Sequence, residues 1–218
     1  DEAMIKLVTS LVFTFQIVLG SLHAQSYTLI GELSQLRQTG ADNSLKRQKR
    51  LFKIRRKNGK DILSTKSKLV NIHAHYSEPK AKSLANLTYT GRFRLSAEGG
   101  GLGVTFYSKY PTTDAYYRLR RYEGNSFHIA PHGTEITDGV IDTGVTPKHK
   151  RWYRFKILAQ SLKDATRIRA KVWLDGRREP RKWQVDCKDS SETRLKAGAV
   201  GVWSMAAGTK LWSDLKVS

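Results

Sequence analysis

Apolar and polar residues alternate in short runs along this chain, most clearly in its last third. In residues 168–174 every second position is apolar, as in the set Ile168, Ala170, Val172 and Leu174. The positions between them hold Arg169, Lys171 and Trp173. Because successive side chains of a β-strand point to opposite faces, this run predicts a strand with one buried face. The pair Asp175-Gly176 that follows it is a turn signal.

The same alternation recurs at fairly even spacing and predicts further short strands. The segments concerned are 51–54, 68–76, 88–95, 104–108, 115–122, 126–129, 152–157, 198–204 and 210–217. Lys57-Asn-Gly-Lys60 contains the Asn-Gly pair that is typical of a two-residue hairpin. The glycine-rich run 99–103 predicts a flexible turn before residues 104–108. No segment shows a helical period of useful length.

Two of these segments predict which side chains are buried. In residues 68–76 the set expected to face the core is Val70, Ile72 and Ala74. The opposite face of that segment holds Asn71, His73 and His75. In residues 88–95 the inward set is Phe93 and Leu95, and the outward set is Arg92 and Arg94.

Many short strands separated by Gly, Asn and Pro turns predict an all-β fold. We expect a two-sheet antiparallel β-sandwich of the jelly-roll kind, with about fourteen strands. The 218 residues favour one domain over two. The sandwich is expected over 46–218. It follows a polar lead-in at 25–45 with one strand near 27–30.

The first residues predict export rather than a folded element. A short basic start at Met4–Lys6 precedes the apolar run 7–20, and Ser21-Leu-His-Ala24 offers a small residue for cleavage. This is the layout of a secretory signal peptide, so we assign 1–24 to the signal and its short N-terminal extension. The apolar run is shorter than the roughly 20 residues that span a membrane, and no second long run follows. We therefore expect a soluble protein that a bacterium secretes or exports to its periplasm. Cys187 is the only cysteine of the sequence, so no intrachain disulfide can form.

The net charge of the chain indicates which kind of molecule it binds. The sequence has 39 Lys and Arg against 19 Asp and Glu, a net charge of +20. Removing residues 1–24, which carry Asp1, Glu2 and Lys6, raises it to +21. Residues 46–60 contain nine basic residues and no acidic one. Such a surface attracts anions, and an export signal makes an acidic or cell-surface polysaccharide a better partner than nucleic acid. A general solubility role for the charge is the alternative.

Several segments resemble one fold superfamily. They are 103–108, 114–122, 127–133, 170–173 with Glu179-Pro180 and Trp183-Gln184, and 198–203. Together they are similar to bacterial secreted domains of the concanavalin A-like lectin and glucanase superfamily, in its laminin G-like jelly-roll group. The resemblance covers roughly 50–217. That superfamily includes lectins, carbohydrate-binding modules, glycoside hydrolases, polysaccharide lyases and adhesion domains, so it implies a fold without implying one activity.

The resemblance also implies a possible calcium ion. Family members commonly hold Ca²⁺ with an acidic residue of the last strand. Here Asp214 would supply the carboxylate, and Gly59 or neighbouring carbonyl groups of the early hairpin would supply further oxygen ligands. Ser213 stands where related sequences often have a second acid. An exposed Asp at a strand end is the alternative.

Catalysis by a retaining glucanase needs paired carboxylates on one strand face. A Glu-x-Asp-x-x-Glu run of that kind is absent from the sequence. A polysaccharide lyase instead needs a Tyr or His base and an Arg that neutralises the uronate carboxylate. The residues that could serve are Tyr116, Arg118, His128 and His132.

The same residues suit a sugar-binding face, in which aromatic rings stack on sugars and Arg contacts hydroxyl or carboxylate groups. We therefore expect a lectin-like domain that binds a glycan in the concave face of one sheet. The candidate binding residues are Tyr107, Tyr116, Arg118, Arg120, His128 and His132, with Asn71, His73 and Trp203 behind them. The alternatives are a structural ladder of cross-strand pairs, a polysaccharide lyase, a glycoside hydrolase of the same fold with an unrecognised site, and a structural or adhesion domain.

The histidines leave one more possibility open. His73 and His75 are two apart on a predicted strand and so point the same way. Together with His128 and His132 they could converge on a Zn or Cu ion. Ordinary hydrogen-bonding histidines on a strand surface are the alternative.

Overall fold

The structure is a computed structural model that describes residues 32–39, 50–76 and 83–218. Within these ranges the chain forms fourteen strands and one short 3-10 turn at Leu33–Gln35. The expected signal segment 1–24 and the expected strand near 27–30 lie outside the described residues. The described ranges contain no helix long and apolar enough to cross a membrane.

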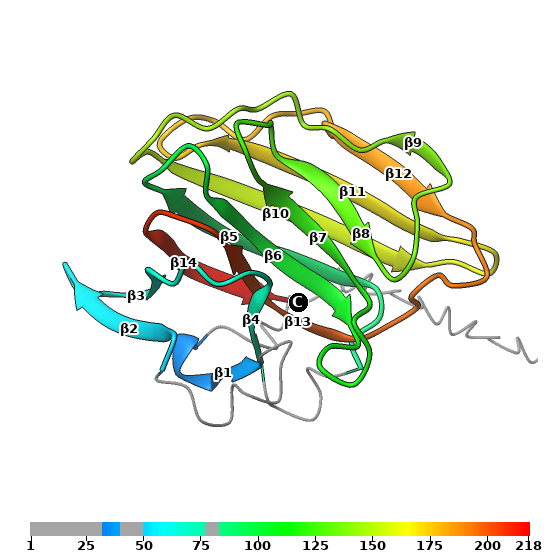
Figure 1. Cartoon of the computed structure of the whole chain (residues 1–218). Helices are drawn as coiled ribbons and strands as arrows, with labels where there is room; N and C mark the ends of the chain where they lie inside the picture. The colour runs from blue at the N-terminus through cyan, green and yellow to red at the C-terminus, as the bar shows by residue number, and fades with distance from the viewer. Residues whose placement is uncertain (1–31, 40–49, 77–82) are drawn as a thin grey trace, which may run out of the picture.

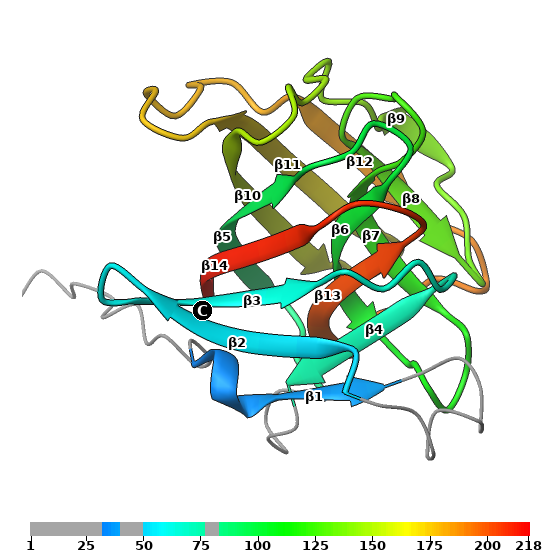
Figure 2. The same cartoon turned by 60° about the vertical axis from the view of Figure 1, so that its left-hand side comes forward.

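The strands form two antiparallel sheets that stack face to face (Figures 1 and 2). The six-stranded sheet has the order β1-β4-β13-β6-β7-β8, with bounds Leu36–Thr39, Ile72–Tyr76, Ala199–Met205, Gly101–Ser108, Tyr116–Arg121 and His128–His132. The eight-stranded sheet has the order β2-β3-β14-β5-β10-β11-β12-β9. Its bounds are Phe52–Lys57, Lys60–Thr65, Lys210–Val217, Leu87–Leu95, Trp152–Ser161, Thr166–Leu174, Val185–Asp189 and Asp138–Val140. The predicted all-β sandwich is confirmed.

The core between the sheets is rich in aromatic rings. Fully buried examples are Tyr89, Phe93, Phe127, Phe155 and Trp212. Buried hydrogen bonds join the sheets across this core. The indole Nε1 of Trp212 on β14 donates to the carbonyl oxygen of Gly103 on β6 at 3.0 Å. The hydroxyl of Tyr89 on β5 donates to the carbonyl oxygen of Gly201 on β13 at 3.1 Å. Because a buried polar group is costly when unpaired, these bonds fix how one sheet lies over the other.

Two local predictions are confirmed in detail. Strands β2 and β3 form the expected hairpin, closed by the pair Lys57 and Lys60. Asn58 and Gly59 have φ angles of 51° and 73°, as the two central residues of a type I′ turn require. Along β11 three of the four residues expected to face inward, Ile168, Ala170 and Val172, are buried, and Leu174 is half-buried against the core.

The segment 68–76 differs from its prediction. Strand β4 begins only at Ile72, and Val70, expected in the core, is 69% exposed. The cause is Asn71, whose φ of 55° lies in the left-handed region and interrupts the alternation. The histidines expected on the surface, His73 and His75, are buried instead.

The glycine-rich run also differs from its prediction. Gly101 and Gly103, expected in a flexible turn, belong to β6. A Cβ atom at Gly103 would lie 2.6 Å from the carbonyl oxygen of Leu119 on the neighbouring β7. Gly101 and Gly103 are therefore packing residues of a strand, and not a flexible connection.

Candidate functional site

The outer face of the six-stranded sheet holds most of the candidate binding residues. Val202, Val104 and Leu119 of this sheet pack in the core, so the residues between them point outward. The outward side chains of β4, β13, β6, β7 and β8 include His73, His75, Trp203, Thr105, Tyr116, Arg118, Arg120, His128 and His132. The strand register brings together residues that are far apart in the sequence, and we call this surface the arginine–histidine face.

The indole of Trp203 lies in the middle of the arginine–histidine face. A Cβ atom at Gly101 would lie 2.9 Å from this ring, which explains why β6 has glycine there. The guanidinium carbons of Arg118 and Arg120 lie over the ring, 4.8 and 5.4 Å from its centroid. These are cation–π distances, and Trp203 is fully buried beneath its neighbours. The two guanidinium groups thus cover the aromatic surface that was expected to stack on sugar.

Asn71 connects three of the predicted residues. Its Oδ1 accepts hydrogen bonds from Trp203 Nε1 at 2.8 Å, from the Tyr116 hydroxyl at 2.9 Å and from His73 Nε2 at 3.0 Å. An indole nitrogen can only donate, so the amide oxygen must face Trp203. A neutral His73 therefore carries its proton on Nε2. Asn71 tolerates the left-handed backbone that this position requires.

The two buried histidines are neutral at pH 7. Burial lowers the pKa of His75 to about 4, and burial also lowers the pKa of His73 well below its ordinary value. The ring of Tyr110 stacks on His73 with the centroids 4.1 Å apart. The hydroxyls of Thr39 and Thr105 lie 2.7 and 3.2 Å from Nδ1 and Nε2 of His75. These contacts make both imidazoles part of the packing beneath the face.

The four histidines do not assemble the metal site that the sequence left open. His128 Nδ1 bonds to the carbonyl oxygen of Ser126 at 2.9 Å, and His132 Nε2 contacts the Asp114 carboxylate at 2.9 Å. His73 and His75, described above, have other partners. Among the described residues, no group of three or more His, Cys, Asp or Glu is placed to share a metal ion.

The part of the face that reaches solvent is polar. The side chains of His132 and Asp114 are 45% and 49% exposed, and Arg120 is half-buried. Arg118 is 7% exposed. Tyr116 is fully buried, and burial raises the pKa of its hydroxyl to about 12, so it remains a hydrogen-bond donor at neutral pH. The accessible groups are therefore the guanidinium of Arg120 and the Asp114–His132 pair, while Arg118 is buried.

Tyr107 does not belong to this face. Strand β6 carries one extra residue between Thr105 and Ser108 relative to the facing β13, and Tyr107 has a φ of 49°. This β-bulge turns the side chain of Tyr107 into the core beside that of Phe106. Its hydroxyl accepts a hydrogen bond from the backbone N–H of Asn86 at 2.9 Å. Alternation alone could not reveal the bulge.

The residues proposed for calcium lie on the other sheet. The Asp214 carboxylate on β14 is 2.8 Å from Arg92 Nε and 3.7 Å from Lys60 Nζ. Gly59 is exposed in the neighbouring hairpin turn. Two cations already neutralise this carboxylate, so its surroundings do not fit a calcium ligand set.

Sequence reasoning missed two residues of the site. Asp114, which pairs with His132, lies in the segment 114–122 that carried the resemblance, but as an isolated acid it gave no signal. Tyr110 lies in the loop between β6 and β7 and reaches His73 only through the folding of that loop.

Comparisons with known proteins agree with this architecture. No protein-family model matches the chain, and no curated protein matches it in sequence. Among solved structures, the carbohydrate-binding module CBM66 from Bacillus subtilis is 12% identical with a TM-score of 0.52, over 83% of this chain and 94% of the module. A protein of unknown function with a galectin-like fold, also from Bacillus subtilis, is 13% identical with a TM-score of 0.54, over 84% of this chain and 89% of that one. Likeness at this level concerns the fold, and by its fold the chain is a concanavalin A-like jelly-roll β-sandwich.

Proposed function

We propose that the protein is a carbohydrate-binding domain whose arginine–histidine face binds an acidic sugar. The observation that carries this proposal is the pair of guanidinium groups of Arg118 and Arg120, held over Trp203 with His132 and Asp114 beside them. A planar guanidinium can donate two parallel hydrogen bonds to a carboxylate. Stacking on an aromatic ring restricts its motion before the ligand arrives, which lowers the entropic cost of binding. The shared fold with a carbohydrate-binding module supports the same class of ligand.

Recognition in this proposal relies on charge and hydrogen bonds. Tyr116 and Trp203 are fully buried, so neither ring offers a free face to a sugar. Arg120, His132 and Asp114 reach solvent and supply both donors and an acceptor for hydroxyl groups. Charge-assisted contacts weaken as salt screens them, so affinity for a uronate should fall with rising salt.

The test is calorimetric titration of the full chain with galacturonate and glucose oligosaccharides of equal length. Binding of the uronate alone is expected, and Arg120→Gln should weaken it by about tenfold or more. Arg169→Gln is the matched control, because Arg169 also lies over an indole, that of Trp183 at 5.2 Å, but on the other sheet. Equal binding of both oligosaccharides, or an equal loss in both variants, would contradict the proposal.

The exposed His132–Asp114 pair keeps a second candidate in view, a polysaccharide lyase of the same fold. A carboxylate can orient an imidazole as a base, and Arg118 could neutralise a uronate carboxylate. Lyases create a conjugated double bond. Incubation of the protein with polygalacturonate should therefore leave the ultraviolet absorbance unchanged if the domain only binds. A rise that His132→Gln abolishes would establish the lyase instead.

We also propose that the protein is exported from a bacterial cell, with residues 1–24 removed. The basic start, the apolar run and Ala24 support this proposal. N-terminal sequencing of the protein recovered from the periplasm or medium of a bacterial host should begin at Gln25. Retention in the cytoplasm with an intact N-terminus would contradict it.

A further inference from the structure

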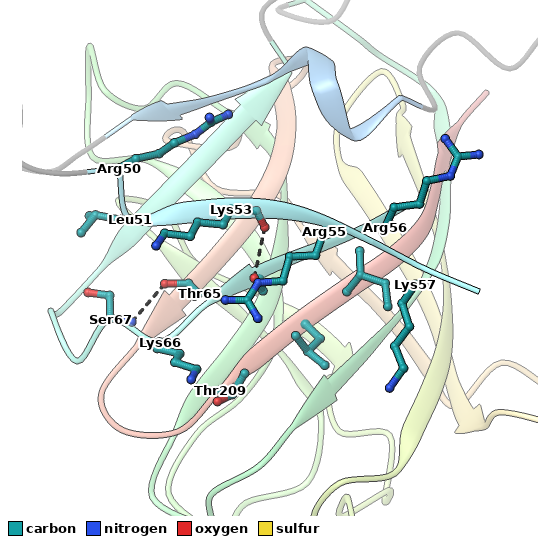
Figure 3. A pocket seen from close by; sticks show the side chains of 13 residues that line it. Arg50, Leu51, Lys53, Arg55, Arg56, Lys57, Thr65, Lys66, Ser67 and Thr209 are labelled. Carbon is teal, nitrogen blue, oxygen red and sulfur yellow. Dashed lines mark hydrogen bonds between the residues drawn. The ribbon is translucent and has the colours of Figure 1, made fainter. Parts of the chain in front are cut away.

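A basic groove lies on the outer face of the eight-stranded sheet, on the opposite side of the sandwich from the arginine–histidine face. Its volume is about 510 Å³, and it is lined by residues of β2 and β3 and by the segments that follow β3 and begin β14. Lys53, Arg55 and Lys57 occupy alternate positions of β2 and so share one side of the strand. Figure 3 shows Arg55 and Lys66 reaching into the same space, while Arg56 extends away from it. The groove is thus bordered by cations from two segments.

The cations of this groove differ from several other cations of the same sheet. Elsewhere on the sheet, five basic side chains have carboxylate partners, in the pairs Arg92–Asp175, Arg154–Asp175, Lys156–Glu179, Lys171–Glu179 and Arg167–Asp186. Lys53, Arg55, Lys57 and Lys66 make no ion pair with any described residue, and no Asp or Glu is among the described residues that line the groove. Neighbouring like charges repel one another. A bound polyanion would remove that repulsion, which no described residue compensates.

We infer that this groove binds a linear anionic polysaccharide, and that it does so independently of the glycan site proposed for the opposite face. Alternate residues of a strand are about 6.8 Å apart, so β2 presents a regular row of cations to a chain with regularly repeating negative charge. Between the cations, Ile62 and Leu211 offer apolar contact to the C–H faces of sugar rings. Sulfate and uronate carboxylate groups share this chemistry.

The lining residues favour a polysaccharide over a nucleic acid. Proteins that bind single-stranded nucleic acid without sequence preference stack the bases on aromatic side chains. The groove has no aromatic lining residue among those described. Its cations could hold a charged backbone, but nothing in the groove would hold the bases.

The position of β2 at the sheet edge provides a competing explanation. Lys side chains on an edge strand can prevent another chain from pairing with it. That role predicts association of the protein when the cations are removed, and it predicts no dependence of polysaccharide binding on these residues.

The experiment measures binding of the full chain to heparin, polygalacturonate and neutral dextran by calorimetry at low salt. The groove variant is Lys53→Gln/Arg55→Gln/Lys57→Gln. The matched control is Arg177→Gln/Arg178→Gln/Arg181→Gln, which removes the same charge from exposed positions between β11 and β12. All six side chains are exposed, so both variants should fold, and thermal unfolding verifies this.

The groove variant should bind at least one anionic polymer about tenfold or more weakly, with a shallower salt dependence, while the control changes less than about threefold. The stronger of the heparin and polygalacturonate titrations identifies sulfate or carboxylate as the preferred group. An equal loss in both variants, wild-type binding to dextran as strong as to the anionic polymers, or tighter binding of an oligothymidylate would overturn the inference. Self-association of the groove variant with unchanged polymer binding would establish edge protection instead. Arg120→Gln alters the arginine–histidine face and should leave polymer binding at the groove intact. Failure of the proposed glycan site can therefore be distinguished from failure of the groove.

Discussion

The side-chain oxygen of Asn71 lies 2.8 Å from the indole nitrogen of Trp203, and this contact ties the start of β4 to the middle of β13. The same oxygen accepts hydrogen bonds from Tyr116 and His73. Trp203 in turn supports the guanidinium groups of Arg118 and Arg120, so this amide orients the ring on which both groups lie.

Replacing Asn71 by alanine should lower the free energy of unfolding by about 2–3 kcal/mol. Three buried or half-buried donors would lose their acceptor, and each unsatisfied group costs about 1–3 kcal/mol when water cannot replace it fully. Urea unfolding followed by tryptophan fluorescence measures the change. Asn86→Ala is the control. Asn86 has a similar φ of 54°, but its side-chain oxygen accepts one hydrogen bond, from the exposed backbone N–H of Ser161. A loss no greater in Asn71→Ala than in Asn86→Ala would contradict the role given to Asn71.

Substitution of Gly201 on β13 should lower the stability of the protein as much as substitution of a large core residue. A Cβ atom at Gly201 would meet the carbonyl oxygen of Ala74 and lie 2.8 Å from the ring of His75. We expect Gly201→Ala to destabilise the protein by about 2 kcal/mol, because overpacking forces neighbours out of their preferred positions. Gly99→Ala, with no atom within 4 Å of the new Cβ, should stay within about 0.5 kcal/mol of the wild type. Thermal unfolding compares the two, and similar melting temperatures would refute the packing argument.

Acid should destabilise the fold through His75. Its pKa falls from an ordinary 6.5 to about 4 on burial, so between these values the unfolded chain binds a proton that the folded chain excludes. The stability that depends on neutral His75 is fully present above pH 6.5 and is lost as the pH falls toward 4. The full effect is on the order of 3 kcal/mol.

Unfolding at pH 7 and pH 4.5 tests this expectation. His75→Gln keeps an amide that can bond to Thr39 and Thr105 but does not titrate, so its stability should fall less between the two pH values than that of the wild type. His149→Gln, at a 44% exposed side chain, should retain the wild-type pH dependence. Parallel pH profiles for the wild type and His75→Gln would show that other groups cause the acid sensitivity.

The thiol of Cys187 should be unreactive in the folded protein. It is 1% exposed, and burial, with the nearby Asp186 and Asp189, raises its pKa to about 12. The reactive thiolate is therefore scarce and shielded. A chromogenic disulfide reagent should label one thiol per chain in denaturant and almost none without it. Fast labelling of the native protein would mean that β12 opens readily.

The sequence predicted features that depend on local pattern. Residues 168–174 alternate without interruption and became the buried face and outer face of β11. The Asn58-Gly59 pair requires two positive φ angles, and the hairpin of β2 and β3 formed around it. In these places local preference and tertiary packing agree.

Features that depend on an irregular backbone or on distant contacts could not be predicted in this way. The bulge in β6 turned Tyr107 inward, and the left-handed Asn71 moved Val70 to the surface. The contact between Asn71 and Trp203 joins residues 132 positions apart. The covering of Trp203 by arginine likewise depends on the order of the strands, which alternation does not encode.

The hairpin of β2 and β3 is one continuous stretch of chain at the edge of its sheet. It contributes a few residues to the core, such as Phe52 and Leu63, while its outward positions alternate with them. Substitutions at those outward positions leave the packing between the sheets untouched. Substitutions at a few positions close together in the sequence can therefore change the surface chemistry of this edge. A substitution in the arginine–histidine face, by contrast, must preserve contacts among five separate strands.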